Sequence, residues 1–484
     1  MKILTDTQIK EADQYTIDNE PVSSIDLMER AANAIARWIS NNISRETALV
    51  FLIGKGNNGG DGLAVARILH HTGYDCSVYL PFDKEELTDN CRVNMERLPA
   101  YINVTDLESI DDKSIIIDAL LGTGVKGKLK EPLSSIIARI NSLPNQVISI
   151  DLPSGMINEF GNANQRIIQA DITLALEFPK LAMLLPEAGG YCGETKIVPI
   201  GLSKEFIDGS SSAYHYVTEE LIETITLKRG KFAHKGDFGH ALLICGSRGM
   251  AGAATLATGA ALRSGCGLVT IHIPEEERLA IQVNYPSAML SLDEAPCFAT
   301  LPENISAYTS IGVGCGLRKD HRTLNAFKQL LNSVYKPIVI DADALNILSE
   351  NYNLRQHIPA GSILTPHLGE LKRLIGEWQN EEDKIKNVRI LASSLQSIIV
   401  VKGAYTMICL PDGDCYFNST GNSGMAKGGS GDVLTGYITG LLSRGYNSAH
   451  AAILGVYKHG LAGDKAAIRS GIERMNSKDL IDFL

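Results

Sequence analysis

The chain has 484 residues, too many for one ordinary domain, so we expect two or three domains. Hydrophobic residues make up 44% and charged residues 21%, as in soluble globular proteins, and the net charge of −10 argues against broad binding to nucleic acids or anionic membranes. We find no apolar run near the roughly 20 residues of a membrane span. The start, MKILTDTQIKEADQYTI, predicts a capped helix rather than a signal peptide, and nine scattered cysteines indicate reduced thiols, so we expect a cytoplasmic protein.

Short β-branched runs alternate with helical patterns along the chain. Most of these runs are apolar on both faces, as parallel strands covered by helices should be. The alternation predicts open α/β sheets, with Gly-rich turns at strand ends where ligands bind in such folds. The expected strands lie within residues 48–54, 114–122, 146–155, 241–246, 268–274, 309–314 and 337–345.

The α/β pattern restarts once. The segment between about 203 and 230 is polar, with a Ser-rich piece before a short helical stretch, so we expect a domain boundary near 215–225. Each half is long enough to bury its own core. In the second half, SIIVVKGAYTMICLPDGDCYFN (397–418) predicts two antiparallel strands joined by a turn at 411–414.

Two glycine-rich loops follow strands in the first half. GKGNNGGDG (54–62) can present several N–H groups to a pyrophosphate, although it could also be a structural loop capped by Asp61. GTGVKGK (122–128) nearly matches a Walker A loop but has Leu129 where Ser or Thr would hold the metal, so we interpret it as a second phosphate-binding turn. Its lysines are candidate proton donors or solvated surface charges.

Three oxygen-bearing side chains stand at strand ends in the first half. They are Asn58, Asp118 and Ser154, the last within DLPSG (151–155). If adjacent strands converge, these oxygens could surround a hard cation, whereas each one alone is as well explained as a turn residue.

The three motifs GKGNNGGDG, DALLGTGVKGK and DLPSG, with SSIDLMERAANAIARWI upstream, resemble the NAD(P)H-hydrate epimerase domain over roughly residues 1–215. The resemblance implies a Rossmann-like three-layer α/β/α fold and potassium held by Asn58, Asp118 and Ser154. It implies acid/base work by Asp151 with Lys126 beside it, because inverting a hydroxyl-bearing carbon requires proton transfer. The residues implied to bind the hydrated dinucleotide are Asn57, Asn58, Gly59, Gly60, Asp61, Gly122, Thr123, Gly124, Val125, Lys126, Gly127, Lys128 and Asp151.

The most informative stretch of the second half is GGSGDVLTG (428–436). Its small residues lead into Asp432 at the start of an apolar helix, where free N–H groups and the helix dipole attract anions. A carboxylate beside a phosphate site suits phosphoryl transfer, in which the nucleophile needs a base. The plainer interpretation is that Asp432 is an N-cap.

Other motifs of the second half also follow strands. A GxxGxxG turn (246–252) precedes a helix of small residues, which could equally serve close helix packing. The run GVGCG (312–316) and His367 each end another strand, although a lone His is usually a satisfied polar residue. The lysine of VKGAYT (401–406) could meet a phosphate.

This order of motifs resembles the ribokinase-like α/β fold over roughly 225–484, in particular ADP/ATP-dependent NAD(P)H-hydrate dehydratases. The resemblance implies Asp432 as catalytic base, and Gly314 is the alternative to Gly316 for the substrate contact. The residues implied to bind the hydrate are Ala253, Gly316, His367 and Asp432. Those implied to bind the nucleotide are Lys402, Gly403, Ala404, Tyr405, Thr406 and Gly431.

The whole chain therefore resembles the family of bifunctional NAD(P)H-hydrate repair enzymes. The resemblance implies that the first domain epimerises the R and S hydrates of NADH and NADPH. The second domain would dehydrate the S form at the expense of ADP or ATP, with Mg²⁺, giving NAD(P)H, AMP or ADP, and phosphate. We also expect a homo-oligomer. The alternatives are a ribokinase-like small-molecule kinase and a first half that is a non-catalytic dinucleotide sensor or oligomerisation module.

Overall fold

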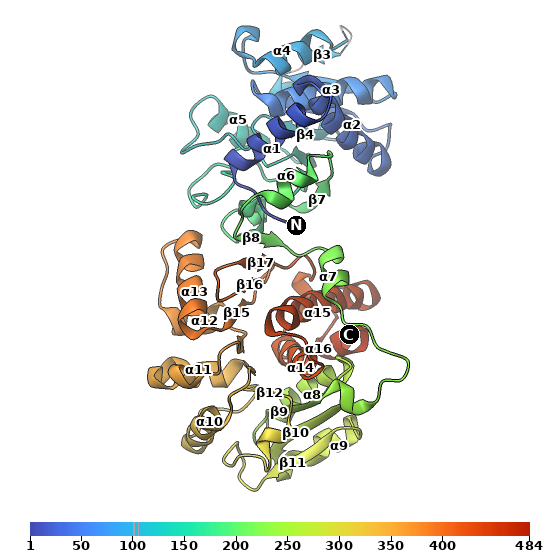
Figure 1. The fold of residues 1–484 in the computed structure, drawn as a ribbon. Helices are drawn as coiled ribbons and strands as arrows, with labels where there is room; N and C mark the ends of the chain where they lie inside the picture. Colours follow the sequence, from blue (N-terminus) through green and yellow to red (C-terminus); the bar gives the residue numbers. More distant parts are fainter. Residues whose placement is uncertain (100–101, 105) are drawn as a thin grey trace. The chain divides into compact units, whose positions relative to one another are not determined.

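The computed structural model describes residues 1–99, 102–104 and 106–484 (Figure 1). The chain divides into two compact units, one of residues 2–214 and the other of residues 215–484 with Met1. Both units are α/β, as predicted from the alternation of elements. Among the described residues, none of the helices is long and apolar enough to span a membrane.

The first unit is built around a seven-stranded parallel sheet of order β3-β2-β1-β4-β5-β6-β7. Its strands are β1 (Leu49–Ile53), β2 (Cys76–Tyr79), β3 (Asn103–Val104), β4 (Ile115–Ala119), β5 (Val147–Ile150), β6 (Ile172–Leu176) and β7 (Glu194–Val198). Its helices are α1 (Asp6–Asn19), α2 (Ser24–Asn42), α3 (Asn57–His71), α4 (Asp89–Glu96), α5 (Leu133–Ile140) and α6 (Lys204–Gly209).

Successive residues of β1 point into different cores, which makes this unit a three-layer sandwich. Phe51 packs with α2 and α3 on one face of the sheet. Val50 and Leu52 pack with α5 on the other face. The expected N-terminal helix is α1, which begins with a capping box made by Thr5 and Gln8.

The second unit contains a ten-stranded sheet of order β11-β10-β9-β12-β13-β14-β15-β16-β17-β8. Its strands are β8 (Tyr214–Tyr216), β9 (His240–Ile244), β10 (Leu268–Pro274), β11 (Met289–Asp293), β12 (Ser310–Val313), β13 (Ile338–Ile340), β14 (Ile363–Leu364), β15 (Ile398–Val401), β16 (Met407–Cys409) and β17 (Cys415–Phe417). Its helices are α7 (Glu219–Ile225), α8 (Ala251–Arg263), α9 (Arg278–Asn284), α10 (His321–Ser333), α11 (Ala342–Glu350), α12 (Leu368–Ile375), α13 (Glu381–Leu395), α14 (Ser430–Ser443), α15 (Ser448–Ser470) and α16 (Ser477–Phe483).

The sheet of the second unit is parallel from β11 to β15 and antiparallel from β15 to β17. The segment 397–418 therefore forms three strands, and the expectation of two is wrong. The reason is a turn at 402–406, closed by hydrogen bonds between Gly403 and Thr406, that divides the first expected strand into β15 and β16. The expected hairpin between β16 and β17 is confirmed.

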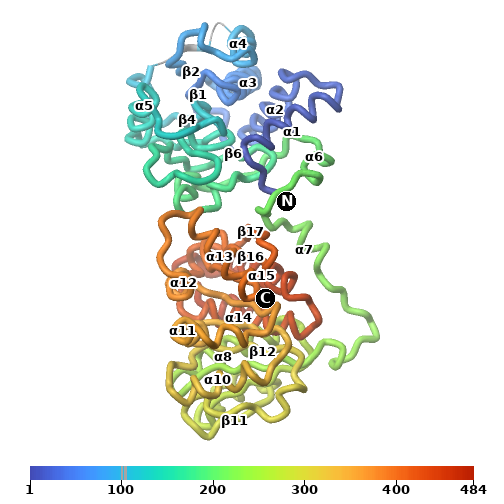
Figure 2. Tube along the Cα trace, turned by 60° about the vertical axis from the view of Figure 1, so that its left-hand side comes forward, coloured from blue at the N-terminus to red at the C-terminus, as the bar shows by residue number. Residues whose placement is uncertain are grey.

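Helices α8 and α14 lie side by side in this unit (Figure 2). Their small residues allow the close approach: a Cβ on Gly436 would lie 2.0 Å from the Ala257 carbonyl oxygen. In Figure 1, α10 to α13 lie on the side of the sheet away from α14 and α15. The small residues after β9 thus serve packing, one of the two interpretations offered by the sequence.

Candidate functional site

The first unit has a cavity of ≈ 630 Å³ at the place where its strand order reverses. From β1 the chain proceeds outward through β2 and β3, and from β4 it proceeds the other way, so the loops after β1 and β4 diverge. Ligands bind at such switch points in open α/β sheets. Residues 55–58 and 120–126 from these two loops line the cavity.

The loop after β1 is shaped by close backbone contacts. A Cβ on Gly54 would lie 1.7 Å from the Leu120 carbonyl oxygen, and one on Gly59 would lie 1.9 Å from that of Gly54. Helix α3 begins at Asn57 with Gly56 as its N-cap, so Asp61 lies inside the helix and its interpretation as a cap is wrong. Gly56, Asn57 and Asn58, at the start of the helix, line the cavity, and the free N–H groups of a helix start are a place where anions bind.

Asn58, Asp118 and Ser154 are brought together behind this loop. The buried Asp118 carboxylate accepts hydrogen bonds from Ser154 Oγ at 2.5 Å, Ser154 N at 2.8 Å and Ser149 Oγ at 2.8 Å. Asn58 Nδ2 donates to the Leu121 carbonyl at 2.9 Å, and Leu121 N donates to Ser154 Oγ at 2.8 Å. Burial raises the pKa of Asp118, while the hydrogen bonds that its carboxylate accepts from Ser154 and Ser149 act to lower it.

Asn58 leaves one oxygen available in this cluster. The residue is 8% exposed, and its Oδ1 has no hydrogen-bond partner in the described part of the chain. A buried, unsatisfied amide oxygen is costly unless a cation or water meets it. The side-chain groups of Asn58, Asp118 and Ser154 that could bind a metal ion are all oxygens, a set that fits a hard cation such as potassium.

Asp151 stands directly after β5 and takes a left-handed conformation with φ 68°, which is uncommon for a non-glycine residue. Its carboxylate forms an ion pair with Lys180, which also donates to the Leu176 carbonyl at 3.0 Å. The two side chains are 15% and 2% exposed. The cation in contact with Asp151 is therefore Lys180, whereas Lys126 is exposed where it lines the cavity.

Two further acids line the cavity with Asp151. Burial, and then the charge of Asp151, raise the pKa of Asp13 to about 6. Burial and the Asp151 charge raise the pKa of Asp61 well above its ordinary value. Carboxyl groups with raised pKa values in a cavity are typical of proton-transfer sites. Sequence reasoning missed Asp13 and Lys180, since Asp13 lies on a helix without a motif and Lys180 is 29 residues from its partner.

The candidate site of the second unit lies where its strand order reverses, between β9 and β12. Helix α14 begins at Ser430 with Gly429, at φ 90°, as its N-cap, so Asp432 lies in the first turn and the N-cap interpretation is wrong. Burial raises the pKa of Asp432 to about 6; a hydrogen bond with Cys315 lowers it, and the charge of Asp341 raises it. Asp432 thus has a pKa suited to a general base near neutral pH.

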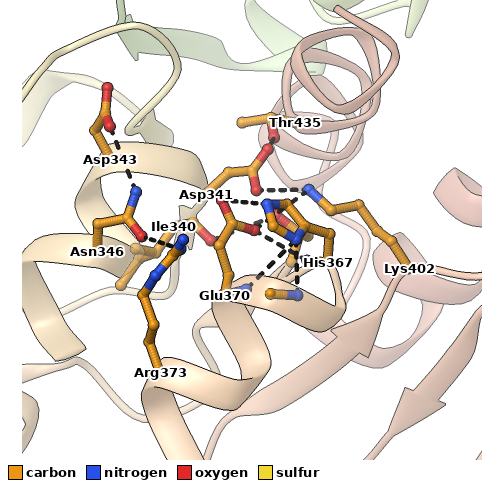
Figure 3. Close-up of polar contacts among 11 residues, drawn as sticks. Ile340, Asp341, Asp343, Asn346, His367, Glu370, Arg373, Lys402 and Thr435 are labelled. Carbon is orange, nitrogen blue, oxygen red and sulfur yellow. Dashed lines mark hydrogen bonds and ion pairs between the residues drawn. The ribbon is translucent and has the colours of Figure 1, made fainter. Parts of the chain in front are cut away.

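Lys402, at the end of β15, reaches the same place (Figure 3). Its Nζ donates to Asp341 Oδ1 at 2.9 Å, and Thr435 Oγ1 of α14 donates to Asp341 Oδ2 at 2.7 Å. A Cβ on Gly431 would lie 3.2 Å from Lys402 Nζ, so the ammonium lies against the first turn of α14. The rest of the loop, residues 403–406, continues from Lys402 towards β16.

His367 is the N-cap of α12 and the bridge partner of Lys402. Its Nδ1 accepts from the backbone N of Gly369 at 2.9 Å. Glu370 Oε2 accepts from His367 N at 2.9 Å and lies 4.0 Å from Lys402 Nζ. The His367 ring is more than half exposed beside Lys402, and its Nε2 lies 3.5 Å from Glu370 Oε1.

Ala253 and Gly316 also meet at this site. A Cβ on Gly316, at φ 65°, would lie 3.0 Å from the Ala253 Cβ. Gly314 faces elsewhere, because a Cβ there would lie 1.8 Å from the Asp341 carbonyl oxygen. The loops after β9 and β12 thus place Ala253 with Gly316, and Gly314 serves the close approach of Asp341.

Comparisons with known proteins match both units of the chain. A family model described as NAD(P)H-hydrate dehydratase matches residues 241–484, and one described as YjeF-related protein N-terminus matches residues 24–182. A bifunctional NAD(P)H-hydrate repair enzyme of Moorella thermoacetica is 34% identical over 100% of this chain and 96% of its own length. The bifunctional NAD(P)H-hydrate repair enzyme of Escherichia coli is 30% identical over 98% of this chain and 92% of its own length. A solved ADP/ATP-dependent NAD(P)H-hydrate dehydratase from Bacillus subtilis, co-crystallised with ATP/Mg²⁺, is 33% identical, with a TM-score of 0.49, and covers 56% of this chain and 95% of its own.

Proposed function

The chain belongs to the family of bifunctional NAD(P)H-hydrate repair enzymes, with an epimerase domain followed by an ADP/ATP-dependent dehydratase domain, and on that premise we propose how its residues perform the two reactions. We assign the epimerase to residues 1–215 and the dehydratase to residues 225–484. The observation that carries the proposal is the position of Asp432, in the first turn of α14 and near the Lys402 ammonium, with a pKa of about 6.

In the dehydratase reaction, Asp432 removes the proton of the ring hydroxyl, and the resulting oxygen attacks the terminal phosphoryl group of ADP or ATP. The N–H groups at the start of α14 and the Lys402 ammonium stabilise the charge on the transferred group. The phosphorylated oxygen then leaves as inorganic phosphate, with electrons supplied by the ring nitrogen, and loss of a proton from the neighbouring ring carbon restores the reduced nicotinamide. Mg²⁺ bound to the nucleotide neutralises phosphate charge. Residues 402–406 and Gly431 hold the nucleotide, and Ala253, Gly316 and His367 hold the hydrate.

Replacing Asp432 by Asn tests this assignment. Without the base, turnover should fall by about 10²–10⁴-fold. The exposed Asp482→Asn, in α16, is a matched control that removes a carboxylate elsewhere. Turnover is followed as recovery of the reduced nicotinamide absorbance from the S hydrate, with phosphate release measured in parallel. Near-normal recovery by Asp432→Asn, or a phosphorylated dinucleotide that accumulates in place of NADH, would contradict the mechanism.

In the epimerase reaction, we assign acid/base work to Asp151. Lys180 orients its carboxylate through the ion pair, and Asp13 supplies a second carboxyl that can carry a proton near neutral pH. Inverting the hydroxyl-bearing carbon needs one proton delivered and one removed, which two carboxyl groups on one cavity can provide. The exposed Lys126, on the loop after β4, is a further candidate for contact with the dinucleotide. The first residues of α3, 57–61, and the loop at 122–128 hold its phosphates.

Interconversion of the two hydrates tests these roles. Asp151→Asn should lose interconversion while still binding NADPH, and Asp13→Asn should lose part of it. Lys126→Gln should weaken binding with a smaller effect on turnover. Chromatographic measurement of the R-to-S ratio against time reads out activity. Normal interconversion by an Asp151→Asn protein that binds NADPH would overturn the assignment.

We further propose that potassium is held by Asn58, Asp118 and Ser154, as the available Asn58 Oδ1 and the oxygen-only surroundings support. Bound there, potassium would supply a positive charge to the dinucleotide phosphates beside the loop after β1.

We also propose a homo-oligomer. The exposed apolar side chains of α9, Leu279 at 61% and Val283 at 78%, support a protein contact on that face. Light scattering of the wild-type chain and Val283→Glu tests it, and a monomer in both would refute it.

A further inference from the structure

We propose that Asp341, at the end of β13, is a positioning residue of the dehydratase: its carboxylate holds the Lys402 ammonium against the first turn of α14 and sets the charge around Asp432. This inference rests on the roles proposed above for Lys402 and Asp432. Asp341 does not itself need to touch the substrate, because it acts through these two groups.

The backbone around Asp341 is built to place this residue. Ala342 follows in a left-handed conformation with φ 48°, which is strained for a residue with a Cβ. Asp341 N donates to the Val313 carbonyl at 3.1 Å. Gly314 packs directly against the Asp341 carbonyl, where there is no room for a side chain on residue 314. Such strain persists only where the surrounding structure holds it, and it gathers at functional sites.

Both oxygens of the carboxylate are used, and they join two separate elements (Figure 3). Oδ1 accepts from Lys402 Nζ on the end of β15, and Oδ2 accepts from Thr435 Oγ1 in α14. Thr435 stands three residues after Asp432 and so on the same side of the helix. The Asp341 side chain is 2% exposed and that of Lys402 is 22% exposed, so water competes little for these contacts. One carboxylate thereby fixes the cation and the helix that carries the base.

The charge of Asp341 acts on the ionisation of both Lys402 and Asp432. Burial would lower the pKa of Lys402, but Asp341 and Glu370 more than offset it and the pKa is raised, so Lys402 stays charged for an anionic phosphate. The same negative charge opposes ionisation of Asp432, while Lys402 favours it. The charged or titratable groups that face Asp432 and Lys402 from the packed elements are Cys315, Asp341, Asp343, Glu370 and His459.

Asp341→Asn separates charge from shape. The amide has the same size, and it can accept from Lys402 while donating to Thr435. We expect kcat/KM for the nucleotide to fall at least about tenfold, since Lys402 loses its nearest anion. The acid limb of the pH profile should move to lower pH by about one unit, because Asp432 loses a negative neighbour and keeps the cation. A merely structural role would lower the amount of folded protein without moving this limb.

Three further variants keep the test decisive. Asp341→Glu restores the charge and should return the acid limb towards that of the wild-type enzyme. Asp482→Asn, the exposed carboxylate of α16 that pairs with Arg469, is the matched control and should leave both the nucleotide KM and the acid limb unchanged. If Asp341→Asn does not fold, Asp341→Ser removes the same charge and leaves room for water beside Lys402 and Thr435.

The measurements are pH profiles of S-hydrate dehydration with ADP and ATP, and circular dichroism of each variant. The proposal is supported if Asp341→Asn and Asp341→Ser shift the acid limb and raise the nucleotide KM, and if Asp341→Glu returns both towards the wild-type values. An unshifted limb in folded Asp341→Asn or Asp341→Ser overturns it, whatever the loss of rate. Asp432→Asn is run beside them: if it retains turnover, the proposed dehydratase site fails, whereas if it is inactive and Asp341→Asn is normal, only the role of Asp341 fails.

Discussion

Lys180→Met removes the cation that faces Asp151 and keeps most of the side-chain volume. Lys180 is 2% exposed and contacts the Asp151 carboxylate and the Leu176 carbonyl, and its ammonium lies 5.6 Å from the Phe178 ring centroid. Methionine preserves the apolar contacts but leaves the Asp151 carboxylate, 15% exposed, without its counterion and near another acid, Asp13. Breaking a buried pair in this way costs about 3–5 kcal/mol, a large share of the roughly 5–15 kcal/mol that stabilises a typical domain.

Fluorescence can report on the first unit alone. The chain has two tryptophans, and Trp38 packs against the core of the first unit. In a Trp378→Phe background, denaturant unfolding followed at Trp38 therefore gives the free energy of unfolding of that unit. Lys180→Met should lower it by about 3–5 kcal/mol. The double variant Lys180→Met/Asp151→Asn should lose less than Lys180→Met alone, because the uncompensated charge is gone.

Two results would refute this reasoning. One is a Lys180→Met protein within about 0.5 kcal/mol of the wild type, the range of ordinary surface substitutions. The other is a double variant whose loss equals the sum of the two single losses, which would mean that Lys180 and Asp151 do not interact energetically.

Three other predictions follow from the two sites. Dehydratase kcat/KM should fall about tenfold per pH unit below about pH 6, because Asp432 must be ionised to act as base. A pH profile whose acid limb lies at the pKa of an ordinary aspartate would contradict this prediction. Gly436→Ala should lower the free energy of unfolding by about 1–3 kcal/mol, since its Cβ would lie 2.0 Å from the Ala257 carbonyl oxygen. Gly252→Ala, in α8 with open space around it, should raise that free energy by about 0.5–1 kcal/mol, and equal values in denaturant titrations would refute the packing account. Potassium, compared with sodium at equal ionic strength, should raise the melting temperature of the first unit by about 2–4 °C for each 1 kcal/mol of binding energy. In scanning calorimetry, Asn58→Ala should lose this increase in melting temperature. An unchanged increase in Asn58→Ala would exclude Asn58 as a potassium ligand.

The sequence predicted the strands well because buried parallel strands are continuous apolar runs bounded by glycine turns. It failed at 402–406, where a turn between two short apolar runs is revealed only by the hydrogen bonds of Gly403 and Thr406. The α/β class and the order of motifs were accessible for the same reason: each motif directly follows a strand, and the carboxyl ends of parallel strands share one edge of the sheet.

The partners of the key side chains were not accessible from the sequence. Lys180 reaches Asp151, and Lys402 reaches Asp341 across 61 residues, through the order of strands in each sheet. A local pattern contains no record of that order. Asp341 did carry a signal, since, like Asp151, it is an acid directly after a buried strand. The alternative interpretation of Asp61 and Asp432 as N-caps is wrong, because Gly56 and Gly429 are the N-caps of these two helices.

The central claim is that two sites in one chain divide the repair of hydrated NADH. The most direct measurement is recovery of the reduced nicotinamide absorbance from a mixture of R and S hydrates with ADP or ATP and Mg²⁺, for the wild type, Asp151→Asn and Asp432→Asn. The wild type should convert the whole mixture, Asp151→Asn should stop once the S fraction is consumed, and Asp432→Asn should recover almost none while still interconverting the hydrates. Full conversion at the wild-type rate by either variant would contradict the account.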